Sequence, residues 1–161
     1  MHVYPSCEEQ AHRADPKESH QVIPAAPIPT KPVVALFDAS DDTIEMVRRM
    51  LDASGLACLV GCHFSDLKKG AIDFARYVGA HNPDVLIFDI SPPYKENWEF
   101  FGTLSDDKAI EGRIVVLTTT NKERLDETVG KDSEAFEVVG KPYDLDQITS
   151  AIHTGLKRVR G

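Results

Sequence analysis

Four consecutive apolar residues, 85–88, follow the turn signal Asn82-Pro83-Asp84 and end on the carboxylate of Asp89. A short, continuous apolar run predicts a strand that is buried on both faces, as in the middle of a parallel sheet. Pro92 and Pro93 come next. Because proline lacks a backbone donor and restricts the residue before it, the chain is expected to leave this strand in an extended turn. Ligands collect at the carboxyl ends of parallel strands, so Asp89 is the first candidate for a functional residue.

Strand and helix patterns alternate from Val33 onward. Apolar runs predict five strands, at residues 33–37, 56–62, 85–89, 113–117 and 136–139. Capping residues and helical periodicity predict five helices, at about residues 41–54, 71–80, 98–104, 121–129 and 145–156. Such alternation implies right-handed crossovers. We therefore expect an α/β fold with a doubly wound, five-stranded parallel sheet of the order 2-1-3-4-5.

Residues 1–32 differ in composition from the rest of the chain. They contain six of the ten prolines and little apolar periodicity, which predicts a disordered or extended leader before a single domain at 33–161. The histidines of this segment, His2, His12 and His20, are irregularly spaced. Their spacing favours solvated side chains over metal ligands.

Charge and hydropathy exclude several classes of protein. A net charge of −8 argues against a nucleic-acid partner. No apolar run approaches the roughly 20 residues that span a membrane, and no secretory signal is recognisable, so we expect a cytoplasmic protein.

The three cysteines, Cys7, Cys58 and Cys62, are too few and too unevenly placed for a disulfide framework. Cys58 and Cys62 share a face of a predicted strand, and we interpret them as small buried hydrophobes rather than as a metal pair.

Polar side chains stand at the ends of four of the predicted strands: Asp38, Asp89, Thr118 and Lys141. In the expected strand order, Asp38 and Thr118 flank Asp89 on neighbouring strands about 4.8 Å away, and Lys141 can reach in from the next strand. Each residue alone is explained by ordinary turn, strand or surface chemistry. Together, at equivalent strand ends, they predict a shallow cleft that accepts an anion.

From Val33 onward, over about four fifths of its length, the chain resembles the receiver domains of two-component response regulators, which have a flavodoxin-like, CheY-like fold. The resemblance is carried by Asp38, Asp89, Pro93, Asn97 at the usual glycine turn, Thr118 and Lys141-Pro142. It implies that a histidine kinase or phosphotransfer protein phosphorylates Asp89. It also implies that Thr118 and Lys141 contact the phosphoryl group.

The resemblance further implies Mg²⁺ bound by Asp38, Asp89 and the backbone carbonyl of Ser91, and a cis peptide bond before Pro142. The acidic pair that is usual in the family is Asp38-Ala39 in this chain, so one carboxylate is missing. Loss of a unit charge about 4 Å from the ion forfeits up to about 4 kcal/mol at an effective dielectric constant of 20. Binding of Mg²⁺ is therefore expected to be weak.

The leading hypothesis is a stand-alone receiver, a phosphoryl-accepting switch that is not an enzyme. By resemblance, it signals to a downstream protein through its fourth helix, fifth strand and fifth helix. An alternative is a degenerate receiver that binds proteins without phosphorylation. Ala39 favours it, as does Val138, which replaces an aromatic residue that changes rotamer in the family. A third hypothesis is a small hydrolase or phosphatase with Asp89 as nucleophile, which is weakened because Ser91, not a second acid, lies two residues on.

Overall fold

The structure is a computed structural model and describes residues 31–131, 137–140 and 145–160; residues 1–30 of the predicted leader lie outside these ranges. Its strands are β1 (Val33–Asp38), β2 (Cys58–His63), β3 (Val85–Asp89), β4 (Ile114–Thr119) and β5 (Glu137–Gly140). They form one sheet in the order β2-β1-β3-β4-β5. The α/β class, the parallel sheet and the order 2-1-3-4 are confirmed. The four-residue β5 pairs in parallel with β4 at the edge of the sheet.

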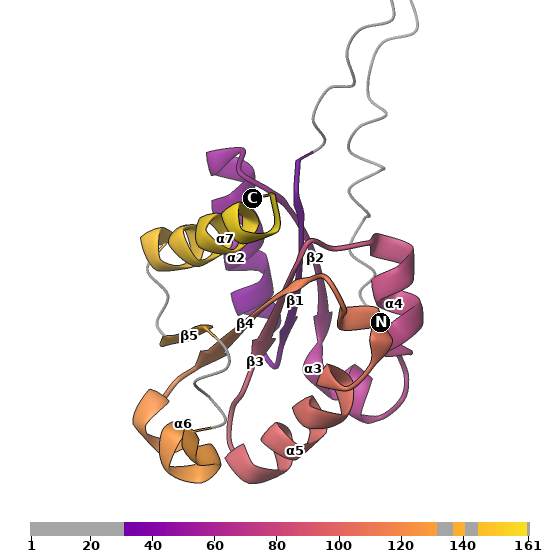
Figure 1. Ribbon diagram of the computed structural model, residues 1–161, viewed down its shortest axis with the longest axis vertical. Coiled ribbons are helices and arrows are strands. Elements are labelled where there is room, and N and C mark those ends of the chain that lie inside the picture. The colour runs from indigo at the N-terminus through magenta and orange to yellow at the C-terminus, as the bar shows by residue number, and fades with distance from the viewer. Residues whose placement is uncertain (1–30, 132–136, 141–144, 161) are drawn as a thin grey trace, which may run out of the picture.

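Helices cover both faces of the sheet. They are α2 (Asp41–Ser54), α3 (Phe64–Lys68), α4 (Phe74–His81), α5 (Tyr94–Ser105), the 3-10 helix η1 (Lys108–Ile110), α6 (Lys122–Val129) and α7 (Leu145–Arg160). Figure 1 shows α2 and α7 on one side of the sheet and α3, α4 and α5 on the other. Within the described ranges, no helix combines the length and the apolar character needed to cross a membrane.

The buried side chains form two clusters because alternate residues of a strand point to opposite faces. The cluster beneath α3, α4 and α5 is rich in aromatic rings, among which Phe37 of β1 stacks on Phe88 of β3 with ring centroids 4.8 Å apart. The cluster beneath α2 and α7 is aliphatic and includes Leu36, Ile44 and Ile152. Both faces of β3 are therefore buried, as the continuous apolar run 85–88 predicts.

Helix α2 begins and ends as predicted. The side chain of Ser40 caps it by accepting a hydrogen bond from the backbone amide of Thr43 at 3.2 Å. Gly55 ends it in the left-handed conformation, with φ at 65°. The helix packs closely on β2, since a Cβ at Gly61 would lie 2.6 Å from a methyl group of Ile44. A glycine at position 61 is thus required for this contact.

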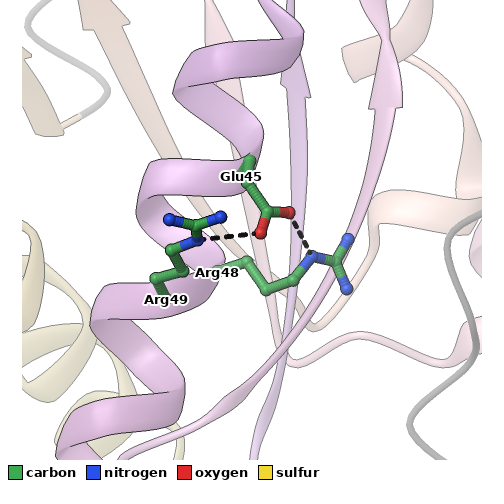
Figure 2. A network of polar contacts seen from close by, with 3 residues as sticks. All are labelled: Glu45, Arg48 and Arg49. Carbon is green, nitrogen blue, oxygen red and sulfur yellow. Dashed lines mark hydrogen bonds and ion pairs between the residues drawn. The ribbon is translucent and has the colours of Figure 1, made fainter.

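A pair of arginines flanks one glutamate on α2. Glu45 accepts a hydrogen bond from Arg49 at 3.0 Å and pairs with Nε of Arg48 at 3.5 Å, and Figure 2 shows the two guanidinium groups on opposite sides of it. Arg49 is exposed, whereas Arg48 is buried. Burial raises the pKa of the Tyr77 hydroxyl in α4, and the positive charge of Arg48 partly offsets this rise. The helical pattern of the sequence did not predict a buried arginine here.

The segment between β2 and α4 differs from the prediction. The sequence predicts no helix between the strand at 56–62 and the helix at 71–80, but α3 forms there and buries Phe64 and Leu67. These two apolar side chains provide the contact with the core that stabilises so short a helix.

The helix predicted at 71–80 begins only at Phe74. It begins there because the Asp73 carboxylate caps α4, accepting a backbone amide hydrogen bond at 2.8 Å. This start sets the buried face at Phe74 and Val78, and Ala75 is exposed.

Candidate functional site

Three of the four predicted site residues lie together at the carboxyl edge of the sheet. In β1 and β3, Phe37 pairs with Phe88, and Asp38 and Asp89 follow them directly. In β3 and β4, Asp89 pairs with Thr118. Register thus brings the three side chains to the ends of neighbouring strands, as predicted. All three are buried, and Asp89 is only 3% exposed.

The ends of β3 and β4 are joined by both side-chain and backbone contacts. The Thr118 hydroxyl donates a hydrogen bond to Oδ1 of Asp89 at 3.1 Å. The backbone amide of Ile90, directly after Asp89, donates to the carbonyl of Thr118 at 2.8 Å. The hydroxyl therefore orients the carboxylate.

The Asp38 carboxylate is oriented by the loop that follows β1. Its Oδ1 accepts a hydrogen bond from the backbone amide of Ser40 at 2.9 Å. Ser40 is also the N-cap of α2, so one residue fixes both the carboxylate and the start of the helix. Asp41 and Asp42 lie in the first turn of α2, are exposed, and complement the helix dipole there.

Asn97 lies in α5 rather than at a turn before it, which corrects the sequence-based expectation. Helix α5 begins at Tyr94, and Asn97 has a helical backbone and is 5% exposed. Its amide nitrogen donates to the carbonyl oxygen of Ser91 at 2.7 Å. Its amide oxygen accepts from Nζ of Lys68 at 2.8 Å. The side chain is used for long-range hydrogen bonds and not for local turn formation.

Lys68 is the residue of this site that the sequence reasoning missed. It belongs to α3 and meets Asn97 across 29 positions of sequence. The available signal was Asn97 itself, an amide where the resembled family has glycine, because a buried amide requires hydrogen-bond partners.

The predicted roles of Lys141 and Pro142, including a cis peptide bond between them, lie outside the described residues. So does the side chain of Val138, whose backbone is part of β5. Among the described residues, the cis peptide bond is Pro92–Pro93.

The oxygen ligands at this edge are of the type that a divalent cation accepts, but together they carry little negative charge. Asp38, Asp89 and the Ser91 carbonyl offer hard oxygens of the type that Mg²⁺ accepts. Each accepts a hydrogen bond from the protein, which helps to fix its orientation. Ala39 adds no donor. A search of the described residues finds no group of three or more His, Cys, Asp or Glu side chains that could hold a metal ion.

The two cysteines of β2 lie in different environments, since Cys58 is half-buried and Cys62 is buried. Cys62 is buried in the aromatic cluster, and both Cys58 and Cys62 are free thiols. Burial, with a smaller contribution from Asp66, raises the pKa of the Cys62 thiol to about 12. Because the thiolate is the form that binds metals, Cys62 behaves as the small buried hydrophobe that the sequence predicts.

No protein-family model matches the sequence, and no curated protein sequence matches it. The structure is similar to the chemotaxis protein CheY4 of Vibrio cholerae, with 19% identity, a TM-score of 0.57, and coverage of 81% of this chain and 99% of that chain. It is also similar to the bacteriophytochrome response regulator AtBRR, with 20% identity, a TM-score of 0.58, and coverage of 78% and 92%.

The receiver domain of nitrogen regulatory protein C is a further similar structure, with 18% identity, a TM-score of 0.58, and coverage of 81% of this chain and 98% of that domain. All three comparisons cover at least 92% of the other chain, which for nitrogen regulatory protein C is its receiver domain alone. The order of β1 to β4 and the placement of Asp38, Asp89 and Thr118 agree with the expectation from the sequence. The chain therefore has the fold of response-regulator receiver domains.

Proposed function

We propose that this chain is a receiver-type signalling switch that accepts a phosphoryl group at Asp89. The observation that carries the proposal is the hydrogen bond from the Thr118 hydroxyl to the Asp89 carboxylate, at 3.1 Å. Strand register places Asp38 on the neighbouring strand beside this pair. A nucleophilic carboxylate, a hydroxyl that can contact a phosphoryl oxygen and a second acid are the groups that such a transfer uses.

In the proposed reaction, a carboxylate oxygen of Asp89 attacks the phosphorus of a phosphohistidine on a kinase or phosphotransfer protein. The new O–P bond forms as the P–N bond breaks, and the imidazole leaves with the electron pair and takes up a proton. The Thr118 hydroxyl orients the nucleophile before transfer and can donate to a phosphoryl oxygen afterwards. Asp89 is only 3% exposed, so the donor reaches little of this residue's surface.

Asp38, Asp89 and the Ser91 carbonyl are the residues proposed to hold Mg²⁺. When bound, the ion supplies positive charge that reduces the repulsion between the phosphodonor and the carboxylates. Lys141 remains a predicted second source of positive charge. Ala39 supports the expectation that the ion binds weakly.

The proposed output is a change in the segment after β4. The Thr118 hydroxyl exchanges a carboxylate partner for a phosphoryl partner, and residues 119–121 connect Thr118 to α6. Only Leu125 of α6 is buried, so little apolar contact opposes a shift of this helix. By analogy with receivers, α6, β5 and α7 form the surface that a downstream protein reads. That the chain acts without an output domain stays a prediction.

The decisive experiment is phosphorylation by a small phosphodonor with Mg²⁺, read by intact mass. Wild type and the control Asp41→Asn, which removes an exposed carboxylate from α2, are expected to gain one phosphoryl group. Asp89→Asn is expected to gain none. Labelling of Asp89→Asn would contradict the assignment of the nucleophile, and an unlabelled wild type would contradict the switch.

A phosphorylation-independent binding module is the second candidate. It is supported by Ala39 in place of an acid and by the low exposure of Asp89. An unlabelled wild type that keeps its fold would favour this candidate. Steady turnover of a small phosphoester, lost in Asp89→Asn, would instead favour the hydrolase hypothesis and contradict the prediction that the chain is not an enzyme.

A further inference from the structure

A chain of two hydrogen bonds connects α3 to the loop after β3. The ammonium of Lys68 donates to the Asn97 amide oxygen at 2.8 Å, and the Asn97 amide nitrogen donates to the Ser91 carbonyl at 2.7 Å. Asn97 is buried, whereas Lys68 reaches it from an exposed position at the end of α3. Three separate segments thus converge on one side-chain amide.

The ammonium determines how the amide is oriented. Lysine donates hydrogen bonds and accepts none, so the oxygen of Asn97 must face Lys68 and its nitrogen must face Ser91. A charged donor at the oxygen also polarises the amide, which strengthens the hydrogen bond that the nitrogen donates. Lys68 therefore acts on the Ser91 carbonyl through Asn97.

We propose that Lys68 and Asn97 are a positioning pair that occupies the Ser91 carbonyl and lowers the affinity of this edge of the sheet for a divalent cation. The inference rests on the cation site of the proposed function. An N–H donor and a metal ion both bring positive charge to the same carbonyl oxygen, so each weakens the binding of the other. The full charge of Lys68 lies two hydrogen bonds away and adds to this repulsion.

By holding the Ser91 carbonyl, Lys68 and Asn97 fix the position of the loop after β3, as a bound cation would. With Asn97 on its carbonyl, Ser91 is held in place by the protein itself. Ala39 provides no negative charge and Lys68 brings a positive one, so both residues make the site less negative. Both differences make the loop less dependent on Mg²⁺ for its position.

The test is a Mg²⁺ titration at constant ionic strength without any phosphodonor. Trp98 is the only tryptophan of the chain and follows Asn97 directly, so its fluorescence is the first readout, and titration calorimetry is the second. Lys68→Met and Asn97→Ala are expected to bind Mg²⁺ roughly fivefold to tenfold more tightly than wild type, the effect of removing one competing hydrogen bond.

Lys69→Met is the matched control, because it removes the same charge from the adjacent exposed residue. It is expected to change the affinity less than about twofold, as for other exposed charges. Lys68→Arg keeps the charged donor and is expected to retain the wild-type affinity, which a purely structural role of Lys68 does not predict.

The inference is overturned if folded Lys68→Met, verified by circular dichroism, binds Mg²⁺ no more tightly than wild type. It is also overturned if Lys69→Met gives the same gain, since the effect would then be one of net charge. Because no phosphodonor is present, this result is independent of whether Asp89 becomes labelled. Failure of the phosphorylation experiment and failure of the positioning pair are therefore distinguishable.

Discussion

The β3–α5 loop, residues 90–93, and the β4–α6 loop, residues 120–121, follow neighbouring strands but are held by contacts of different strength. The first is tied down at both Ile90 and Ser91, by hydrogen bonds of 2.8 and 2.7 Å. In the second, Asn121 accepts a hydrogen bond from the backbone amide of Arg124 at 3.0 Å at the start of α6, but Thr120 is exposed, and its contact with the Tyr94 hydroxyl at 3.5 Å is at the upper limit of a hydrogen bond. Movement at this edge should therefore begin in the β4–α6 loop.

The same difference continues into the helices that follow. Helix α5 buries Asn97, Phe101 and Leu104, whereas Leu125 is the only buried residue of α6. A helix with little buried apolar surface belongs to the less stable part of a fold. Of the two segments, the one that follows Thr118 therefore resists displacement less.

The largest expected effect is at the single anchor of α6. Leu125→Ala should destabilise α6 by about 2–5 kcal/mol, because it removes a fully buried leucine side chain. Hydrogen exchange of the α6 amides should accelerate far more than exchange in α5. Val129→Ala, at a half-buried position of the same helix, should cost about 1 kcal/mol. Equal acceleration in both helices would remove the distinction between them.

Alkaline pH should weaken the aromatic cluster, in which Cys62 is buried and on which both α5 and α6 pack. Burial raises the Cys62 pKa from 9.0 to about 12, so the unfolded chain loses this proton first as the pH rises. The resulting stabilisation is complete below pH 9 and is lost between pH 9 and 12, by about 2 kcal/mol at pH 10.5. Urea unfolding of Cys62→Val should show a shallower decline over this range. An unchanged slope would show that Cys62 is not buried as a thiol.

Replacement of the hydroxyl at the end of β4 should have an intermediate effect. Thr118→Val keeps the shape of the side chain but removes the donor to Asp89, which should cost about 1–2 kcal/mol in urea unfolding. Thr119→Val is the matched control, because Thr119 is also buried but its hydroxyl only accepts a long 3.4 Å contact from Asn121. A larger cost for the control would contradict the assigned hydrogen bond.

The smallest expected effect is at the contact between the first residue of α5 and the β4–α6 loop. Tyr94→Phe removes a hydroxyl that lies 3.5 Å from Thr120, and the free energy of unfolding should change by less than about 0.5 kcal/mol. Equilibrium unfolding in urea measures it. A cost above about 1 kcal/mol would mean that the β4–α6 loop is held as firmly as its neighbour.

Much of the fold was predictable because its signals are local. The apolar run before Asp89 predicts a strand buried on both faces, and Ser40 and Gly55 predict both ends of α2. The helix predicted at 145–156 from helical periodicity is present as α7, which buries Ile148 and Ile152. The division of the 64–81 segment into α3 and α4 was not predictable in the same way. Core contact stabilises the short helix α3, and the pattern of Phe64 and Leu67 alone does not reveal that contact.

The candidate site likewise has residues that the sequence predicts and one that it does not. Asp38, Asp89 and Thr118 were predictable because each ends a recognisable strand, and the register of parallel strands brings such ends together. Lys68 was not, because its partner is 29 residues away and on another helix. The geometry of Lys141 lies outside the described residues.

By itself, the sequence determined the five strands and all of the longer helices, though not α3, and it placed two acids and a hydroxyl at one edge of a parallel sheet. These outcomes depend on apolar periodicity, caps and strand ends, which are properties of short segments. Only the tertiary structure decided that Arg48 is buried and that Asn97 joins Lys68 to the Ser91 carbonyl. Hydrogen bonds between distant segments depend on how helices pack on the sheet, and that packing is a property of the whole chain.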